Sequence, residues 1–151
     1  IPALKLDNGT VIMESTAICR YLESLYPEPN LFGESAIEIA SIEMWQARIY
    51  NELMIPLAMA FRHLHPGMSN MEIQNKEYGE TQKNIGVKSL KYFDMVLSES
   101  EFVAGNRYTF ADIQMITTTD FFIGLNRLSM EDYPEIKRHF NLMSERSSFS
   151  A

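Results

Sequence analysis

Residues 1–18 of this chain read IPALKLDNGTVIMESTAI and decide its fold. Apolar residues recur at every second position on both sides of Asn8-Gly9, which is the period of a β-strand. Asn and Gly tolerate positive φ, so this pair predicts a two-residue type I′ hairpin turn. The second strand runs directly into a helix that opens at Glu14 and Ser15. Unpaired backbone N–H groups and the positive end of the helix dipole meet there, a geometry that binds a carboxylate or a phosphate.

Everything after this first helix, which we expect over residues 15–26, is predicted to be helical. The prolines of residues 27–34 end the first helix and mark a linker. Ser35 with Glu38, and Ser69 with Glu72, both have capping-box spacing, so each pair predicts a helix start. We expect a long helix from Ser35 towards residue 63, bent at Pro56, and another from Ser69 to about residue 98.

A third capping box closes the helical pattern. Thr109 as N-cap has Asp112 at the third helical position, and we assign both a structural capping role. The helix behind them, 110–125, is apolar over most of its circumference and is expected to be central. A last helix is predicted over residues 134–146. The fold class is therefore mostly α, with a β-hairpin and helix followed by an all-α bundle.

Composition excludes several partners. The 151 residues carry 13 basic and 20 acidic side chains, a net charge of −7, with no basic cluster. Nucleic acid and membrane surfaces are therefore not expected as partners. Cys19 is the only cysteine. It precludes an internal disulfide, fits a cytoplasmic protein, and is expected to be buried within an apolar helical pattern.

The order of these motifs resembles cytosolic glutathione transferases over nearly the whole chain. In that family a Val/Ile–Pro dipeptide with a cis peptide starts a strand, an Asp/Asn-Gly turn follows, and Glu-Ser-x-Ala-Ile opens a helix. The segments 102–112 and 133–146 are similar to the family's staple segment and terminal helix. The resemblance implies a remnant of the thioredoxin-like domain at 1–26, a linker at 27–34 and an all-α domain at 35–151. Because the hairpin has no partner strands, we expect the first part of the thioredoxin-like domain to be missing.

The resemblance also implies a glutathione site. Glu14 and Ser15 would hold the γ-glutamyl end of glutathione, and the backbone of Ile1, before a cis Pro2, would pair with its cysteinyl part. Glutathione is the implied co-substrate, a small hydrophobic electrophile the second substrate, and a second copy of the chain the partner in a homodimer. Without the family resemblance, Glu14 and Ser15 would be interpreted only as helix-capping residues.

The residue that activates the thiol in the common classes lies in the missing segment. His63 and Ser69 flank the loop between the two long helices and are our candidates for replacing it, because a ring N–H and a hydroxyl can position a water or stabilise a thiolate. Ser69 is equally explained as a helix N-cap. His63-Leu64-His65 lacks a third ligand nearby, so no metal site is expected.

The predicted function is nucleophilic addition of the glutathione thiolate to small electrophiles, as in detoxification, with this chain inactive by itself. The alternative is a non-catalytic module of the same fold that binds glutathione or a protein partner. Glutathione-dependent disulfide reduction is a third possibility and would need a cysteine in the missing segment.

Overall fold

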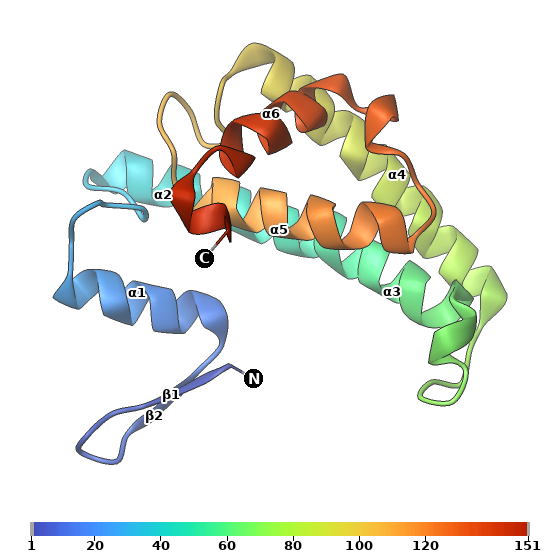
Figure 1. The fold of residues 1–151 in the computed structure, drawn as a ribbon, viewed down its shortest axis with the longest axis horizontal. Coiled ribbons are helices and arrows are strands. Elements are labelled where there is room, and N and C mark those ends of the chain that lie inside the picture. Colours follow the sequence, from blue (N-terminus) through green and yellow to red (C-terminus); the bar gives the residue numbers. More distant parts are fainter. Residues whose placement is uncertain (1, 151) are drawn as a thin grey trace.

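The structure is a computed structural model and describes residues 2–150. A two-stranded antiparallel sheet of β1 (Ala3–Lys5) and β2 (Val11–Met13) leads into α1 (Ser15–Leu25), and these elements lie beside a larger helical body (Figure 1). The body consists of α2 (Ala36–Arg48), η1 (Ile49–Met54), α3 (Ile55–Leu64), η2 (Pro66–Met68), α4 (Lys76–Glu99), α5 (Phe110–Leu125), η3 (Met130–Asp132), α6 (Pro134–Ser144) and η4 (Ser147–Ser150). The mostly helical fold predicted from the sequence is confirmed.

The predicted hairpin is present, but its turn and its register differ from those of a two-residue turn at Asn8-Gly9, which would pair Lys5 with Ile12. Leu4 pairs with Ile12 across the two strands. The N–H of Gly9 donates to the carbonyl of Leu6 at 2.9 Å, and Gly9 alone in the turn has positive φ, at 88°. A type I′ turn would also need positive φ at Asn8, so that prediction is wrong. A three-residue loop whose last residue is a left-handed glycine closes the hairpin instead.

The long helix after the linker is continuous but changes its winding before Pro56. Residues Ile49–Met54 form a π-helix, in which the N–H of Ile55 bonds to the carbonyl of Tyr50, five residues earlier. Proline has no N–H to donate, and in a regular α-helix its ring clashes with the carbonyl four residues before it. The wider π turn accommodates that ring, so the irregularity predicted as a bend at Pro56 is a π-helix just before it.

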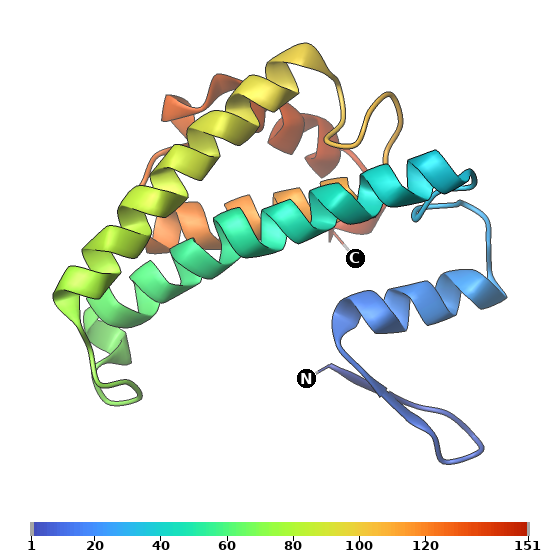
Figure 2. The same cartoon turned by 180° about the vertical axis from the view of Figure 1, so that it is seen from behind.

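The hydrophobic core lies around α5, as predicted. This helix packs against α2, η1, α3 and α6 (Figure 2), and eight of its residues are buried. Leu53 and Leu57 from the η1–α3 segment meet Leu90 and Phe93 from α4 in the same cluster, all at 0% exposure. The core thus belongs to the helical body and fixes the end of α3, where His63 lies.

Two glycines of α4 let α3 approach closely. A Cβ placed on Gly86 would lie 2.5 Å from Cδ2 of Leu57, and one on Gly79 would lie 2.8 Å from Leu64. Sequence reasoning treats a glycine inside a helix as a weak point. Here both glycines are buried and make the α3–α4 contact possible.

The first helix is far more exposed than its apolar pattern predicts. None of its residues is buried, and Leu22 and Leu25 are 42% and 53% exposed. The expectation that Cys19 is buried is therefore wrong, because its side chain is half-buried. Among the described residues, α1 contacts mainly β1 and β2 and has no helix packed along its apolar stripe.

A polar junction joins α1 to the helical body. The carboxylate of Glu23 accepts the backbone N–H groups of Leu31 and Phe32 at 2.7 and 3.1 Å. From the other side, the guanidinium of Arg107 donates to the backbone carbonyl of Asn30 at 2.6 Å and pairs with Glu38. Residues 27–34, which sequence analysis treats only as a linker, are thus held from both sides.

Candidate functional site

The predicted glutathione half-site lies where β2 turns into α1. The reversal takes place within one residue, Glu14, whose φ of 70° and ψ of 123° are unusual for a residue with a side chain. Such backbone strain persists where the surrounding structure imposes it, and it concentrates at functional sites. Ser15 is the first helical residue. Both side chains are exposed, and neither makes a hydrogen bond to another residue within 2–150.

The backbone N–H groups at the start of α1 are arranged to bind an anion. The N–H of Ile18 is the first to bond within the helix, to the carbonyl of Glu14 at 3.0 Å. The N–H groups of residues 15–17 therefore have no partner inside the helix, and they lie at its positive end. This arrangement is suited to a carboxylate such as the γ-glutamyl carboxylate of glutathione.

The remaining half-site residues are only partly described. Pro2 is exposed and directly precedes β1. Ile1 lies outside the described residues, and with it the peptide bond to Pro2. The predicted cis peptide and the backbone pairing at Ile1 therefore stay predictions.

His63 lies in the last turn of α3 and its ring holds the following loop. Its Nδ1 accepts the backbone N–H of Asn75 at 3.2 Å, and the ring meets Tyr78 edge-on at a centroid distance of 5.0 Å. An imidazole nitrogen that accepts carries no proton, so in the neutral ring the proton is on Nε2. His63 is thus a hydrogen-bond donor through Nε2.

Ser69 does not start a helix. α4 begins at Lys76, and Asn75 is its N-cap, with a side chain that accepts the N–H of Tyr78 at 3.0 Å. The second capping-box prediction is wrong because Glu72, instead of capping, forms an ion pair with Arg62. Ser69 is exposed in the loop, with its backbone N–H bonded to the carbonyl of Pro66.

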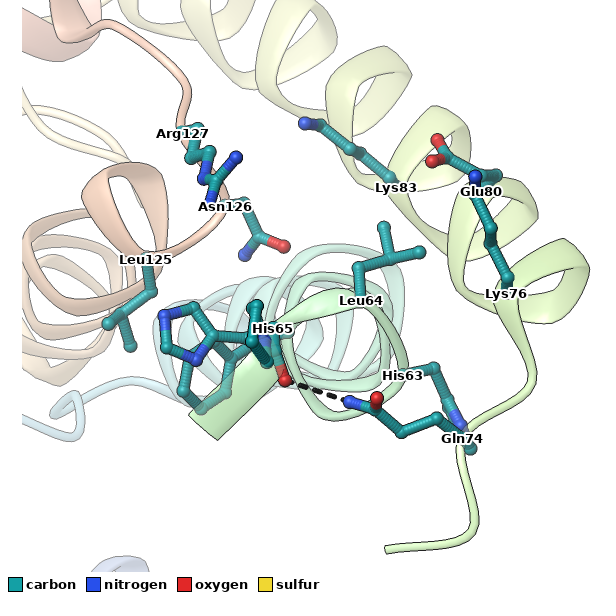
Figure 3. A pocket seen from close by; sticks show the side chains of 12 residues that line it. His63, Leu64, His65, Gln74, Lys76, Glu80, Lys83, Leu125, Asn126 and Arg127 are labelled. Carbon is teal, nitrogen blue, oxygen red and sulfur yellow. Dashed lines mark hydrogen bonds between the residues drawn. The ribbon is translucent and has the colours of Figure 1, made fainter. Parts of the chain in front are cut away.

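The loop that carries Ser69 is tied down by a residue to which sequence reasoning assigned no role. The side-chain amide of Gln74 donates to the backbone carbonyl of Arg62 at 2.9 Å and to that of His65 at 2.8 Å. Figure 3 shows the bond to His65. Both carbonyls belong to the end of α3, where the last four carbonyls of a helix lack helical partners. A glutamine shortly before a helix start is the only sequence signal for this role, and it is a weak one.

The end of α3 also borders a cavity of about 340 Å³. Its lining comes from three helix ends: Phe61, His63, Leu64, His65 and Pro66 from α3 and η2; Gln74, Lys76, Glu80 and Lys83 before and along α4; and Leu125, Asn126 and Arg127 at the end of α5. Ser69 is not part of the lining. The structure therefore places one of the two candidate catalytic residues at a cavity.

The capping pair of α5 is a buried polar centre with no access to solvent. Asp112, at 0% exposure, accepts the backbone N–H groups of Thr109 and Val103, each at 2.8 Å. The Nε2 of His139 lies 3.0 Å from the same carboxylate. These contacts fix the start of α5, which is a structural role.

Residues 2–150 contain neither a cluster of metal ligands nor a helix that could span a membrane. No group of three or more His, Cys, Asp or Glu side chains is arranged to hold a metal ion. No helix in this part of the chain has the length and apolar character needed to cross a membrane.

Comparison with known proteins matches both parts of the fold. Residues 1–30 match the model of the glutathione S-transferase N-terminal domain, and residues 53–147 match that of the C-terminal domain. Glutathione S-transferase 2 of Saccharomyces cerevisiae is 35% identical over 150 residues, covering 98% of this chain and 64% of the relative. The chain thus spans less than two thirds of that relative's length.

Solved structures agree. The crystal structure of Gtt2 from Saccharomyces cerevisiae has a TM-score of 0.90 at 34% identity, over 99% of this chain and 73% of that one. A glutathione S-transferase of class Gtt2 from Vibrio parahaemolyticus has a TM-score of 0.87 at 33% identity, over 100% and 70% of the two chains. The chain belongs to the glutathione S-transferase family.

Proposed function

We propose that this chain is part of an enzyme that adds the thiolate of glutathione to small hydrophobic electrophiles. The observation that carries the proposal is the strained Glu14–Ser15 turn, with exposed side chains and backbone N–H groups free within α1. The turn lies in the segment that matches the family's N-terminal domain. A carboxylate docked on these N–H groups and on the Ser15 hydroxyl would anchor the γ-glutamyl end of glutathione.

His63 is proposed to act on the thiol as a donor. Because its Nδ1 already accepts the Asn75 N–H, the Nε2–H is available to stabilise a thiolate, either directly or through a water that Ser69 also holds. Stabilising the thiolate lowers the pKa of the thiol and raises the fraction that is nucleophilic near neutral pH. The thiolate sulfur then forms the new bond to the electrophilic carbon as the leaving group departs.

Several further parts of the proposal follow the family. The backbone of Ile1 and the ring of Pro2 would line the cysteinyl part of glutathione, the protein would work as a homodimer, and it would be cytoplasmic. Cys19 is not a good candidate for disulfide chemistry, because burial raises the pKa of its thiol and so lowers its thiolate fraction. We expect the 151-residue chain alone to turn over very slowly, since in the family further strands complete the glutathione site.

Calorimetric titration of the chain with glutathione tests the half-site. Replacing Ser15 with Ala removes a hydroxyl bond to a carboxylate and is expected to weaken binding by about 10-fold. Ser24→Ala is the matched control, because Ser24 is exposed on the same helix and bonds only to its own turn. An equal loss of affinity for glutathione in both variants, or no loss in either, would contradict the assignment.

Two substitutions of His63 separate its proposed chemistry from its structural bond. His63→Asn keeps an acceptor near Nδ1 and removes the Nε2–H, whereas His63→Gln places a donor near Nε2 and removes the Nδ1 acceptor. In the full-length transferase, with chlorodinitrobenzene as the electrophile, Asn is expected to lower kcat about 10-fold or more, with the KM for glutathione unchanged. Gln is expected to retain more of kcat but to lower the melting temperature. A non-catalytic module would instead bind glutathione with no turnover in any variant.

A further inference from the structure

The tip of the hairpin carries the only asparagine of this chain that is followed by glycine, Asn8-Gly9. Both residues are exposed, and the turn lies at the outer end of the hairpin, away from the helical body, in both Figure 1 and Figure 2. The side-chain nitrogen Nδ2 of Asn8 makes no hydrogen bond within residues 2–150. The proposed glutathione chemistry assigns no role to this turn.

The side-chain carbonyl of Asn8 is polarised for attack by a backbone nitrogen. Its Oδ1 accepts the backbone N–H of Thr10 at 2.9 Å, which directs the side chain along the peptide that joins Gly9 to Thr10. A bond between Cγ of Asn8 and the backbone nitrogen of Gly9 would close a five-membered succinimide ring. Negative charge develops on Oδ1 as this ring closes, and an N–H donor already placed on that oxygen stabilises it.

Gly9 leaves this ring closure sterically open. The side chain of the following residue normally hinders the approach, but Gly9 has none, and a Cβ placed on it would meet no atom within 4 Å. The N–H of Gly9 donates to the carbonyl of Leu6 at 2.9 Å, and this bond must open before the nitrogen can attack. It belongs to a two-stranded sheet with strands of three residues each. Such a sheet is marginally stable, so its tip opens at a low cost in free energy.

We propose that Asn8 is a modification site, where the side-chain amide is lost through a succinimide and the residue becomes aspartate or isoaspartate. Hydroxide removes the proton of the Gly9 nitrogen, and this nitrogen forms a bond to Cγ of Asn8. The bond between Cγ and Nδ2 then breaks, and Nδ2 takes a proton from water and leaves as ammonia. A second water opens the ring at one of its two carbonyls, which gives aspartate or isoaspartate. The reaction consumes water and needs no oxidant or reductant.

The isoaspartate product changes the hairpin, whereas the aspartate product keeps its backbone. In isoaspartate the main chain runs through Cβ and Cγ, so the loop between Leu6 and Thr10 gains one backbone atom. The bond from the Leu6 N–H to the Thr10 carbonyl and the register of β1 and β2 depend on the length of this loop. Because β2 runs directly into Glu14, a loss of register reaches the predicted glutathione half-site. This consequence rests on the proposed function, whereas the modification itself goes beyond it.

Mass spectrometry of the incubated chain tests the modification. Trypsin cleaves after Lys5 and Arg20, and Asn8 is the only asparagine in the peptide between them. After incubation at mildly alkaline pH, we expect this peptide to gain one mass unit and to accept a methyl group from S-adenosylmethionine through isoaspartyl methyltransferase. Asn70, exposed in a loop and followed by methionine, is the matched control and is expected to react about 10-fold more slowly. Equal rates at the two asparagines would overturn the proposal.

A synthetic peptide of residues 6–20 shows how far the fold protects the site. In the folded chain, we expect Asn8 to react at a rate within about 10-fold of the rate in this unfolded reference. A rate in the chain more than about 100-fold lower would refute the proposal, because the bond between Gly9 and Leu6 would then hold the turn closed.

Calorimetric titration with glutathione tests the consequence for the half-site. The isoaspartate form, isolated by chromatography, is expected to bind glutathione about 10-fold more weakly than the Asn8→Asp variant, which has the same charge and an unchanged backbone. Equal affinities of these two proteins would overturn the proposed effect on the half-site. If the fresh chain does not bind glutathione, the proposed function fails, whereas the mass gain of the peptide that contains Asn8 still decides the modification.

Discussion

At the scale of single residues, the most demanding position is Asp112. Its carboxylate is fully buried and accepts two backbone N–H groups, the Thr109 hydroxyl and a contact from His139. These contacts occupy both carboxylate oxygens, and no water reaches Asp112 to replace them. The Asp112 side chain therefore connects the start of α5 both to the loop before it, through Val103, and to α6, through His139.

Replacing Asp112 with Asn is expected to destabilise the fold by roughly 3–5 kcal/mol. The amide directs its own N–H groups at donors that need an acceptor, and buried donors without a partner are costly. Urea unfolding measures the loss. Asp120→Asn, an exposed position on the same helix, is the control and should change stability by less than about 0.5 kcal/mol. Similar losses in both variants would contradict this account.

The thiol of Cys19 gives a second residue-scale prediction. Burial raises the pKa of the Cys19 thiol, so less thiolate is present at a given pH than for a free cysteine. Because the chain has one cysteine, its alkylation by iodoacetamide can be followed without interference. We expect a slower reaction than for a small thiol at the same pH, and an inflection at a higher pH. A faster reaction would show that Cys19 lies in a different environment.

At the scale of elements, the α3–α4 contact makes two glycines behave in opposite ways. Gly86→Ala inserts a methyl group 2.5 Å from the buried Leu57 and is expected to cost about 1–2 kcal/mol, even after the gain in helix propensity. Gly124→Ala, in α5 with open space around it, is expected to stabilise by about 0.5–1 kcal/mol. Thermal unfolding of both variants measures these changes in stability. A more stable Gly86→Ala variant would contradict the packing argument.

At the scale of the molecule, the junction that holds residues 27–34 should respond to pH. The hydrogen bond from Arg107 lowers the pKa of the Glu38 carboxyl in the folded chain. A depressed carboxyl pKa contributes stability above the unfolded pKa, near 4.5, and that contribution is lost as pH falls through the lower folded value. We therefore expect Glu38→Gln to lose less stability than the native chain on acidification below about pH 4.5.

Both side chains of this pair are partly exposed, so added salt should shrink that difference. The measurement is the urea midpoint of both proteins across the acid range, at low and high salt. Parallel curves for the two proteins would show that the pair contributes nothing to acid sensitivity.

Sequence reasoning predicts whatever depends on local patterns. The Thr109–Asp112 cap and the central helix behind it follow from spacing and periodicity, and the structure has both. Sequence reasoning fails where two segments compete for the same role, or where residues distant in sequence come into contact. Ser69 and Asn75 both have N-cap chemistry, and the ion pair of Glu72 with Arg62, ten residues earlier, settles the choice in favour of Asn75.

The same limit applies to the candidate sites. Glu14 and Ser15 are adjacent in sequence and could be identified there, although the left-handed backbone at Glu14 leaves no trace in composition. Asn126 and Lys83 come from different helices, and only the fold brings them to one cavity. The grouping of Lys76, Lys83 and Arg127 at this cavity could not be predicted, because the sequence does not show which charged side chains the fold brings together.

The π-helix before Pro56 has a consequence for the length of this chain. A π turn holds one residue more than an α turn, so η1 takes up one extra residue inside an otherwise regular helix. Deleting one residue from 49–54 would restore α winding, and the helix after the deletion would keep its orientation. His63 would then face the same side of the molecule. Deleting one residue from the regular winding of α3 before His63 would instead rotate the ring by about 100°. The candidate catalytic ring thus tolerates a change of length in η1 and does not tolerate one in α3.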